Sequence, residues 1–341
     1  MNLITLWLSL AILSGVILFT SHFLAKSADL IAEKTNIGRS FVGVILLATA
    51  TSLPELGTGI SSIMLIGQPD LAAGDAFGSN LFNLLIIGVL DTSWRNTPIL
   101  GVMTKSSLYA AVAGIILILV ACLAIFIHGS FGLSLHWPVS PISLMLVTLF
   151  VASMYAIYCR DRIDIQDINP SAVVVEYYKE KTLSSGVLMY AVSASIMVLT
   201  SLMLARTGDS LAEALNWDVS FVGTQFLALS TSLPELATSI SAMRLGSPEL
   251  AVSNLLGSNM FNMGFVLFVD ELAYFEGVFW SSISTVHMIT CAFAILMTLL
   301  VIIAANRADS SYSSNRIRFL GPVLLLVYIA ASVSIFVVAQ V

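Results

Sequence analysis

Long apolar runs decide what this chain can fold into. Of its 341 residues, 58% are hydrophobic and only 10% are charged, and the mean hydropathy is +0.97. A soluble core of this size could not hide so much apolar surface, so the composition indicates a membrane protein. About 20 apolar residues cross a bilayer as a helix. The sequence predicts ten such helices, at about 3–25, 40–65, 70–90, 104–127, 140–158, 185–206, 219–244, 249–270, 280–305 and 319–338.

The basic residues predict the orientation of these helices. Among the 14 Lys and Arg residues, all but Arg206 fall in loops on the side reached after odd-numbered helices. The positive-inside rule makes that side cytoplasmic, so both termini are expected outside. The first run lacks a basic start and a small-residue cleavage site, so we expect a retained helix and not a signal peptide. No basic tract suggests nucleic-acid binding.

The chain repeats itself. Residues 40–56 (SFVGVILLATATSLPEL) and 220–236 (SFVGTQFLALSTSLPEL) share 12 of 17 positions at an offset of 180, and GSNLFN at 78–83 matches GSNMFN at 257–262. We therefore predict two five-helix repeats, 1–159 with its core motif at 40–91 and 185–341 with its core motif at 219–270, joined by a cytoplasmic connector at 160–184. Because five is odd, the second repeat must be inverted, an arrangement typical of secondary transporters with a midplane site.

The repeated TSLPE motif places a proline and a glutamate inside apolar helices. Pro54 and Pro234 lack an N–H, so helices 2 and 7 are predicted to break there and to free a carbonyl one turn earlier. Glu55 and Glu235 follow the breaks, in helix cores without Lys or Arg. A carboxylate at this depth is costly unless it is paired or neutral. A simple kink with a protonated or snorkelling glutamate is the alternative, but retention of the motif in both copies favours one cation shared by both glutamates.

Helices 3 and 8 each carry a polar stripe at i, i+4 and i+8, which lies on one helix face. Serine hydroxyls and asparagine carbonyls are neutral hard ligands that suit Ca²⁺ or Na⁺. Small and amide residues also pack transmembrane helices together. We assign that packing role to Gly78 and Gly257, and we favour ligand roles for the stripe residues Ser79, Asn83, Ser258 and Asn262.

Asp75 breaks the symmetry of the stripes, because Asn254 occupies its place in the second repeat. With outward termini, Asp75 should lie outward of Asn83 in an external vestibule. Two interpretations remain open from the sequence: a minor cation site, or a solvated residue at the mouth of the vestibule.

TSLPE followed by GSNxFN, in duplicate, resembles the calcium/cation antiporter superfamily, particularly its sodium/calcium exchanger branch. The resemblance covers the whole length. It implies an all-α polytopic membrane protein that exchanges Ca²⁺ against Na⁺ by alternating access, with helices 1 and 6 sliding across a bundle of the others. It also implies no enzymatic activity, no catalytic residues and no cofactor. We expect the bilayer and the transported ions to be its only partners and a monomer to be functional.

The resemblance further implies which residues bind the metal ions: Thr51, Ser52, Glu55, Ser79 and Asn83 in the first repeat, and Thr231, Ser232, Glu235, Ser258 and Asn262 in the second. Potassium-dependent relatives carry an aspartate at the end of the second GSNxFN motif. Here both motifs end in asparagine, which argues against K⁺ co-transport. Two central carboxylates are left, enough to neutralise one divalent ion.

Other functions stay open at this point. Exchange of Ca²⁺ or another divalent cation against protons is the nearest alternative, since desolvated glutamates can release a cation by protonation. An intramembrane hydrolase is disfavoured because no Ser–His pair repeats, and a channel is disfavoured because inverted repeats with broken helices are typical of carriers. The short connector suggests a prokaryotic inner membrane.

Overall fold

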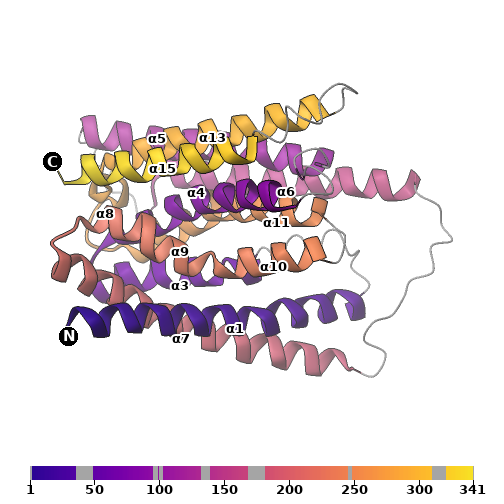
Figure 1. The fold of residues 1–341 in the computed structure, drawn as a ribbon, viewed down its shortest axis with the longest axis horizontal. Helices are drawn as coiled ribbons and strands as arrows, with labels where there is room; N and C mark the ends of the chain where they lie inside the picture. The colour runs from indigo at the N-terminus through magenta and orange to yellow at the C-terminus, as the bar shows by residue number, and fades with distance from the viewer. Residues whose placement is uncertain are drawn as a thin grey trace.

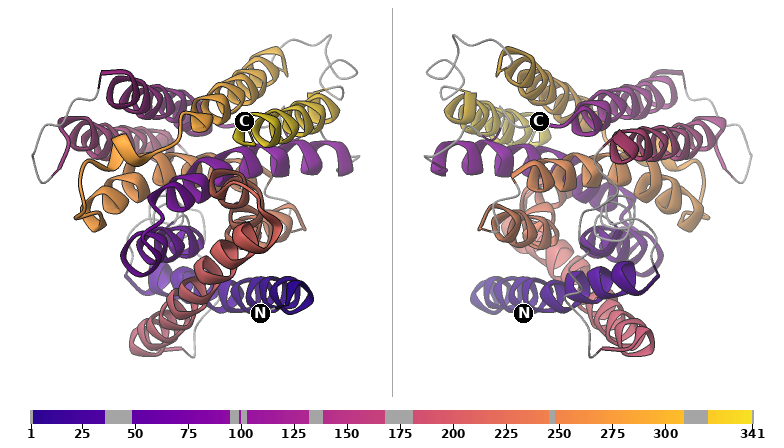
Figure 2. Two further views of the ribbon diagram at one scale, coloured as in Figure 1. Left: turned by 90° about the vertical axis from the view of Figure 1, so that its left-hand side faces the viewer. Right: turned by 90° about the vertical axis from the view of Figure 1, so that its right-hand side faces the viewer.

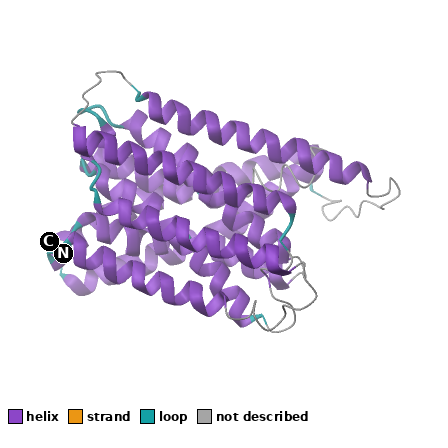
Figure 3. Ribbon diagram, turned by 90° about the horizontal axis from the view of Figure 1, so that it is seen from above, coloured by secondary structure: helices purple, strands orange, loops and turns teal. Residues whose placement is uncertain are grey.

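The fold is a bundle of long helices. A computed structural model describes residues 2–35, 49–94, 99, 103–131, 139–167, 181–244, 248–308 and 320–340. Within these ranges helices are the only regular secondary structure, which confirms the predicted all-α class. The helices run along a common direction, and the two chain ends lie at the same end of the bundle (Figures 1 and 3).

The first half of the chain contributes α1 (Leu3–Thr35), α3 (Leu53–Ser61), the π-helical segment η1 (Ser62–Ile66), α4 (Pro69–Ser93), α5 (Lys105–Phe131) and α6 (Pro141–Asp167). Helix α6 continues into the predicted connector as far as Asp167. The start of the helix predicted at 40–65 and the connector residues 168–180 lie outside the described residues.

The second half contributes α7 (Leu183–Leu215), α8 (Val219–Val222), the π segment η3 (Gly223–Leu227), α9 (Ala228–Thr231), α10 (Leu233–Arg244), α11 (Pro248–Phe261), the π segment η4 (Asn262–Val266), α12 (Leu267–Ala273), the 3₁₀ segment η5 (Phe279–Ser282), α13 (Val286–Ala308) and α15 (Leu320–Ala339). Within the described ranges, eight helices are long and apolar enough to cross a membrane, and Leu53–Ile66 and Val219–Thr231 are shorter apolar helices.

Acidic and other polar side chains are buried inside the bundle beside its apolar core, and much of the exterior is apolar. Ile4 and Leu188 are 71% and 66% exposed, whereas Glu55, Asp75 and Glu235 are completely buried. This distribution is the reverse of a soluble protein. Hydrocarbon solvates apolar side chains well, while a charged group is tolerated only in the protein interior or a cavity. The protein is therefore an integral membrane protein.

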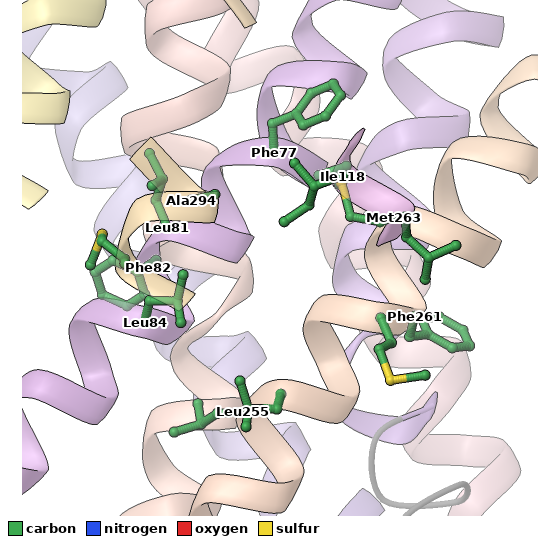
Figure 4. Packing of buried hydrophobic residues seen from close by; sticks show 14 of the residues in the cluster. Phe77, Leu81, Phe82, Leu84, Ile118, Leu255, Phe261, Met263 and Ala294 are labelled. Carbon is green, nitrogen blue, oxygen red and sulfur yellow. The ribbon is translucent and has the colours of Figure 1, made fainter. Parts of the chain in front are cut away.

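Two main apolar clusters hold the helices together, and a small third one joins α7 to α4, α8 and η3 through Ala212, Leu71, Val222 and Leu227. The larger of the two main clusters joins α4, α5, α11 and α13 and includes Leu81, Ile118, Leu255 and Ala294 (Figure 4). The smaller one joins α1 to α7 through residues such as Ile17. These two helices lie side by side at one edge of the bundle, crossing each other (Figures 1 and 2). The contact between α1 and α7 is thus made by a cluster distinct from the larger one, and α7 also reaches α4 through the third cluster.

Asp70, in the first turn of α4, ties that helix to its neighbours. Its carboxylate accepts hydrogen bonds from the backbone N–H of Ser284 at 2.7 Å and from the hydroxyl of Ser220, and it pairs with His287 Nε2 at 3.2 Å. His287 in turn stacks on Phe77. This network fixes the start of α4 against α8 and the segment before α13.

Gly78 allows α4 and η3 to approach closely. A Cβ at position 78 would lie 2.3 Å from the carbonyl oxygen and 2.6 Å from the Cα of Thr224. One turn earlier, a Cβ on Gly74 would lie 3.1 Å from the Cα of Gly223. Small residues at a helix interface permit such backbone contact in membranes. The predicted packing role of Gly78 is confirmed.

We predict that Gly78→Ala destabilises the protein by about 1–3 kcal/mol, because the added methyl must push two backbones apart. The midpoint of thermal unfolding in detergent should fall by several degrees. Gly114→Ala is the matched control, since a Cβ there meets nothing within 4 Å; it should leave the midpoint unchanged or raise it. An equal response of the two variants would contradict the close contact.

Candidate cation-binding site

The two TSLPE motifs interrupt their helices at the serine. Ser52 has φ −92° and ψ 11° directly before α3, and Ser232 has φ −85° and ψ 6° between α9 and α10. These angles lie close to the sparsely allowed bridge region, which is frequent at functional sites. The breaks predicted at TSLPE are therefore present, with matching geometry in both halves. They place Glu55 and Glu235 in the first turns of α3 and α10.

The serines at the breaks connect the two halves of the chain. Ser52 Oγ donates to Glu235 Oε1 at 3.3 Å, and Ser232 Oγ donates to Glu55 Oε1 at 3.3 Å. The two contacts are equivalent under exchange of the repeats. Each glutamate is thus held by the helix break of the other half, which brings the two acidic side chains into one buried site.

A second serine holds each glutamate from within its own half. Ser79 Oγ on α4 donates to Glu55 Oε1 at 3.2 Å, and Ser258 Oγ on α11 donates to Glu235 Oε1 at 3.2 Å. One oxygen of each carboxylate therefore accepts two hydroxyl hydrogen bonds.

The other carboxylate oxygens have no protein partner. Oε2 of Glu55 and of Glu235 is buried and makes no hydrogen bond with the described residues. Both side chains are 0% exposed, and no Lys or Arg pairs with either of them in the part of the chain that the structure describes. No group of three or more His, Cys, Asp or Glu side chains is positioned to hold a metal there. A cation at this site would depend on two carboxylates and on neutral oxygens.

The two predicted asparagine ligands differ in their surroundings. Asn83 Nδ2 donates to Asn259 Oδ1 at 2.9 Å, and Asn259 Nδ2 donates to the carbonyl of Asn80 at 3.3 Å. Asn262 begins the π segment η4, and both of its amide atoms are buried without a hydrogen bond among the described residues. π segments inside α-helices are frequent at functional sites. Asn83 therefore also joins α4 to α11, whereas Asn262 is left available.

The predicted threonines are buried at the same breaks. Thr51 lies within hydrogen-bond reach of Glu235. Thr231 Oγ1 donates to Asp75 Oδ1 at 2.8 Å and lies 3.4 Å from Ser79 Oγ. The structure thus places the predicted serines and threonines around the two glutamates, whereas no hydrogen bond joins Asn83 or Asn262 to either glutamate within the described residues.

Asp75 belongs to this buried region, and the interpretation as a solvated mouth residue is wrong. It is 0% exposed and accepts hydrogen bonds from Thr58 and Thr231. In the second half, Asn254 Nδ2 donates to Thr238 Oγ1 at 3.1 Å. The two contacts join equivalent positions of the two halves, but the partner of the threonine is a carboxylate in the first half and an amide in the second.

Sequence reasoning missed Asp270, another completely buried aspartate, on α12. Its position relative to GSNxFN is the same as that of Asp91 in the first repeat. This recurrence of an acidic residue near the end of an apolar helix is a signal that could have identified it. Asn259, which bonds to Asn83, was also missed, because only its contact across α4 and α11 distinguishes it from other polar helix residues.

A family model described as "Sodium/calcium exchanger protein" matches residues 5–159 and 185–337, which is most of the chain. The chain belongs to this sodium/calcium exchanger family. It is therefore a membrane transporter of the calcium/cation antiporter superfamily and not an enzyme, as the repeated motifs indicated.

Bacterial and archaeal proteins are among the relatives of this exchanger-family chain. It is 25% identical over 257 residues to the inner membrane protein YrbG of Escherichia coli, covering 75% of this chain and 76% of YrbG. It is 26% identical to the putative antiporter CaxA of Alkalimonas amylolytica, with 76% and 79% of the two chains covered. It is 24% identical to the sodium/calcium exchanger MaX1 of Methanosarcina acetivorans, with 93% and 94% covered.

Solved structures share the fold of this family member. The structure of native YfkE superposes with a TM-score of 0.66 at 19% identity, covering 96% of this chain and 92% of YfkE. The sodium-calcium exchanger NCX_Mj, from a crystal soaked with 10 mM Na⁺ and no Ca²⁺, gives a TM-score of 0.61 at 22% identity, covering 97% and 99%.

The contrast between Asn83 and Asn262 predicts opposite effects of leucine at these positions. Asn83→Leu leaves Asn259 Oδ1 buried without its donor and should cost about 1–3 kcal/mol. Asn262→Leu removes two unpartnered polar atoms and should be neutral or stabilising. Thermal unfolding in detergent, without Ca²⁺ and Na⁺, measures both. Loss of stability in Asn262→Leu as large as in Asn83→Leu would contradict the assigned surroundings.

Proposed function

We propose that this protein exchanges Ca²⁺ against Na⁺ across the membrane by alternating access, with the ions bound between Glu55 and Glu235. The observation that carries this proposal is the pair of buried glutamates, cross-bridged by Ser52 and Ser232, each with one oxygen that accepts no hydrogen bond from the described residues. Two carboxylates without a basic partner require positive charge from solution when they are ionised.

The oxygens around this pair fit hard cations. Ca²⁺ takes six to eight oxygen ligands, and carboxylates, hydroxyls and amide carbonyls are the types it prefers. We propose that Glu55 and Glu235 bind the ion together with neutral oxygens supplied by the remaining predicted ligands Thr51, Ser52, Ser79, Asn83, Thr231, Ser232, Ser258 and Asn262. One Ca²⁺ or two Na⁺ ions compensate the two negative charges, so the two kinds of ion compete for one site.

This charge balance explains why the carrier would exchange ions and not leak them. During alternating access the site must close to both sides of the membrane. Without an ion, this closed state would hold two uncompensated carboxylates away from water, which is costly in free energy. Passing through it with either Ca²⁺ or Na⁺ avoids that cost. The site would therefore change sides mainly when loaded, and movement of one kind of ion would be coupled to return of the other.

The α1–α7 pair is the proposed moving part. It has its own apolar cluster, and it contacts both glutamate-bearing segments, since α7 packs on α3 and α1 packs on α10. Sliding of this pair over the remaining helices would alter access to Glu55 and Glu235 without dismantling the larger cluster around α4 and α11.

We further propose ten membrane spans in two inverted repeats, with both termini outside and the connector in the cytoplasm of a prokaryotic cell. The common position of both chain ends at one end of the bundle supports an even number of spans (Figure 3). A single chain contains the whole glutamate site, which supports a functional monomer.

Proton coupling is the second candidate. The unpartnered oxygens of Glu55 and Glu235 could be neutralised by protons as well as by Na⁺. Ca²⁺ or another divalent cation would then leave the site as protons arrive.

Reconstituted vesicles distinguish these functions. Vesicles loaded with Na⁺ should take up ⁴⁵Ca²⁺, and Glu55→Gln or Glu235→Gln should reduce uptake to the level of empty vesicles. Glu276→Gln, at an exposed acidic residue, is the control and should transport like the wild type. Uptake driven by a pH gradient in the absence of Na⁺ would establish the proton-coupled alternative. Undiminished uptake in either glutamine variant would refute the assigned site.

The proposed topology predicts which parts of the chain are accessible from outside the cell. A short epitope tag at either terminus should bind antibody on intact cells, whereas a tag in the connector at 160–184 should bind only after permeabilisation. Detection of one terminus only after permeabilisation would rule out an even number of spans.

A further inference from the structure

A second pair of buried carboxylates lies beside the glutamate site. Asp75 on α4 and Asp270 on α12 are both 0% exposed, and the two helices pack against each other. No Lys or Arg pairs with either residue in the described ranges. These two aspartates have no role in the glutamate site as proposed above.

Helix α3 brings the two aspartates to one place. Thr58 donates its hydroxyl hydrogen bond to Asp75. The next residue, Gly59, lies against Asp270, because a Cβ at position 59 would be 2.3 Å from Asp270 Oδ1 and 3.0 Å from Oδ2. Glycine at position 59 is therefore needed for the carboxylate of Asp270 to reach this point.

The carboxylate of Asp270 faces α3 at Gly59 and makes no hydrogen bond with the described residues. Both of its oxygens are buried and unpartnered within the part of the chain that is described. The hydroxyl of Ser62, one turn beyond Thr58, is also buried and unpartnered there. A fully buried carboxylate with two unused oxygens is costly unless a cation or a proton compensates it. Together with Thr58, these groups offer carboxylate and hydroxyl oxygens, the ligands of hard cations.

We propose that Asp75 and Asp270, with Thr58, bind a second divalent cation next to the ion held by Glu55 and Glu235. Two carboxylates balance one divalent charge, whereas one monovalent ion would leave a buried negative charge uncompensated. The site lies toward the junction of η1 and α4, and the replacement of Asp75 by Asn254 in the second half makes it one-sided.

Hydroxyl groups connect this second site to the first. Thr231 Oγ1 donates to Asp75 and lies 3.4 Å from Ser79 Oγ, which donates to Glu55. The inference rests on the proposed function, because the aspartate site would bind an ion next to the glutamates on one side of the membrane. Its test must therefore report on each pair of carboxylates separately.

Equilibrium binding of ⁴⁵Ca²⁺ to the purified chain in Na⁺-free detergent solution counts the ions. The wild type should bind two Ca²⁺ per chain, Asp270→Asn one, Glu235→Gln one, and the double variant none. Glu276→Gln should bind two. If the wild type binds only one ion and Asp270→Asn retains it, or if Asp270→Asn leaves two ions bound, the second site does not exist. If the wild type binds one ion that Asp270→Asn loses and Glu235→Gln keeps, the proposed function is refuted and the aspartate site is supported.

Gly59→Ala tests the same site without removing a charge. The added methyl displaces the Asp270 carboxylate and should weaken one of the two ions by about tenfold or more, a range typical of disturbed ligand positions. Gly114→Ala is the matched control and should leave both affinities unchanged. This variant decides the matter if Asp270→Asn fails to fold, because unchanged binding of both ions in Gly59→Ala would overturn the proposal.

Discussion

Two ionisable carboxylates, buried in a membrane bundle with no basic partner among the described residues, are the constraint on which this structure depends. Glu55 and Glu235 could be neutralised by Lys or Arg in a protein that needed only a stable fold. Here serine hydroxyls donate hydrogen bonds to one oxygen of each glutamate. The other oxygen accepts none from the described residues and is available to a cation from solution. A permanent cation would satisfy the charge but would prevent exchange. The missing counter-charge is therefore what makes the site suitable for mobile ions.

The rest of the fold serves this arrangement. Apolar side chains cover much of the outside, where lipid solvates them, and the interior combines an apolar core with buried polar and acidic residues. Close packing at Gly78 and the network around Asp70 fix α4, which carries Ser79, Asn83 and Asp75. Most of the apolar residues buried between α1 and α7 form a cluster separate from the larger one, which is the basis for the proposed sliding of this pair over the other helices.

Duplication produced a site whose two halves are no longer equal. The serine contacts to the glutamates match closely in length, and Thr58 and Thr238 occupy equivalent positions. Their partners differ, since Thr58 binds a carboxylate and Thr238 binds the amide of Asn254. Equivalent positions of the duplicated motifs therefore carry unequal charge, and under the proposed inverted arrangement an ion would meet different surroundings on the two sides of the membrane.

The sequence by itself determined the all-helical membrane class, the internal duplication, the helix breaks and the pair of glutamates, because hydropathy, proline chemistry and repetition are local properties that survive without a fold. Tertiary structure alone decided that Ser52 and Ser232 each bond to the glutamate of the other half, that Asp75 is buried and not solvated, and that Asp270 joins it beside Gly59. These contacts join residues far apart along the chain. Whether such residues are buried and close together depends on how the helices pack against one another. The spacing of residues within one segment does not specify that packing.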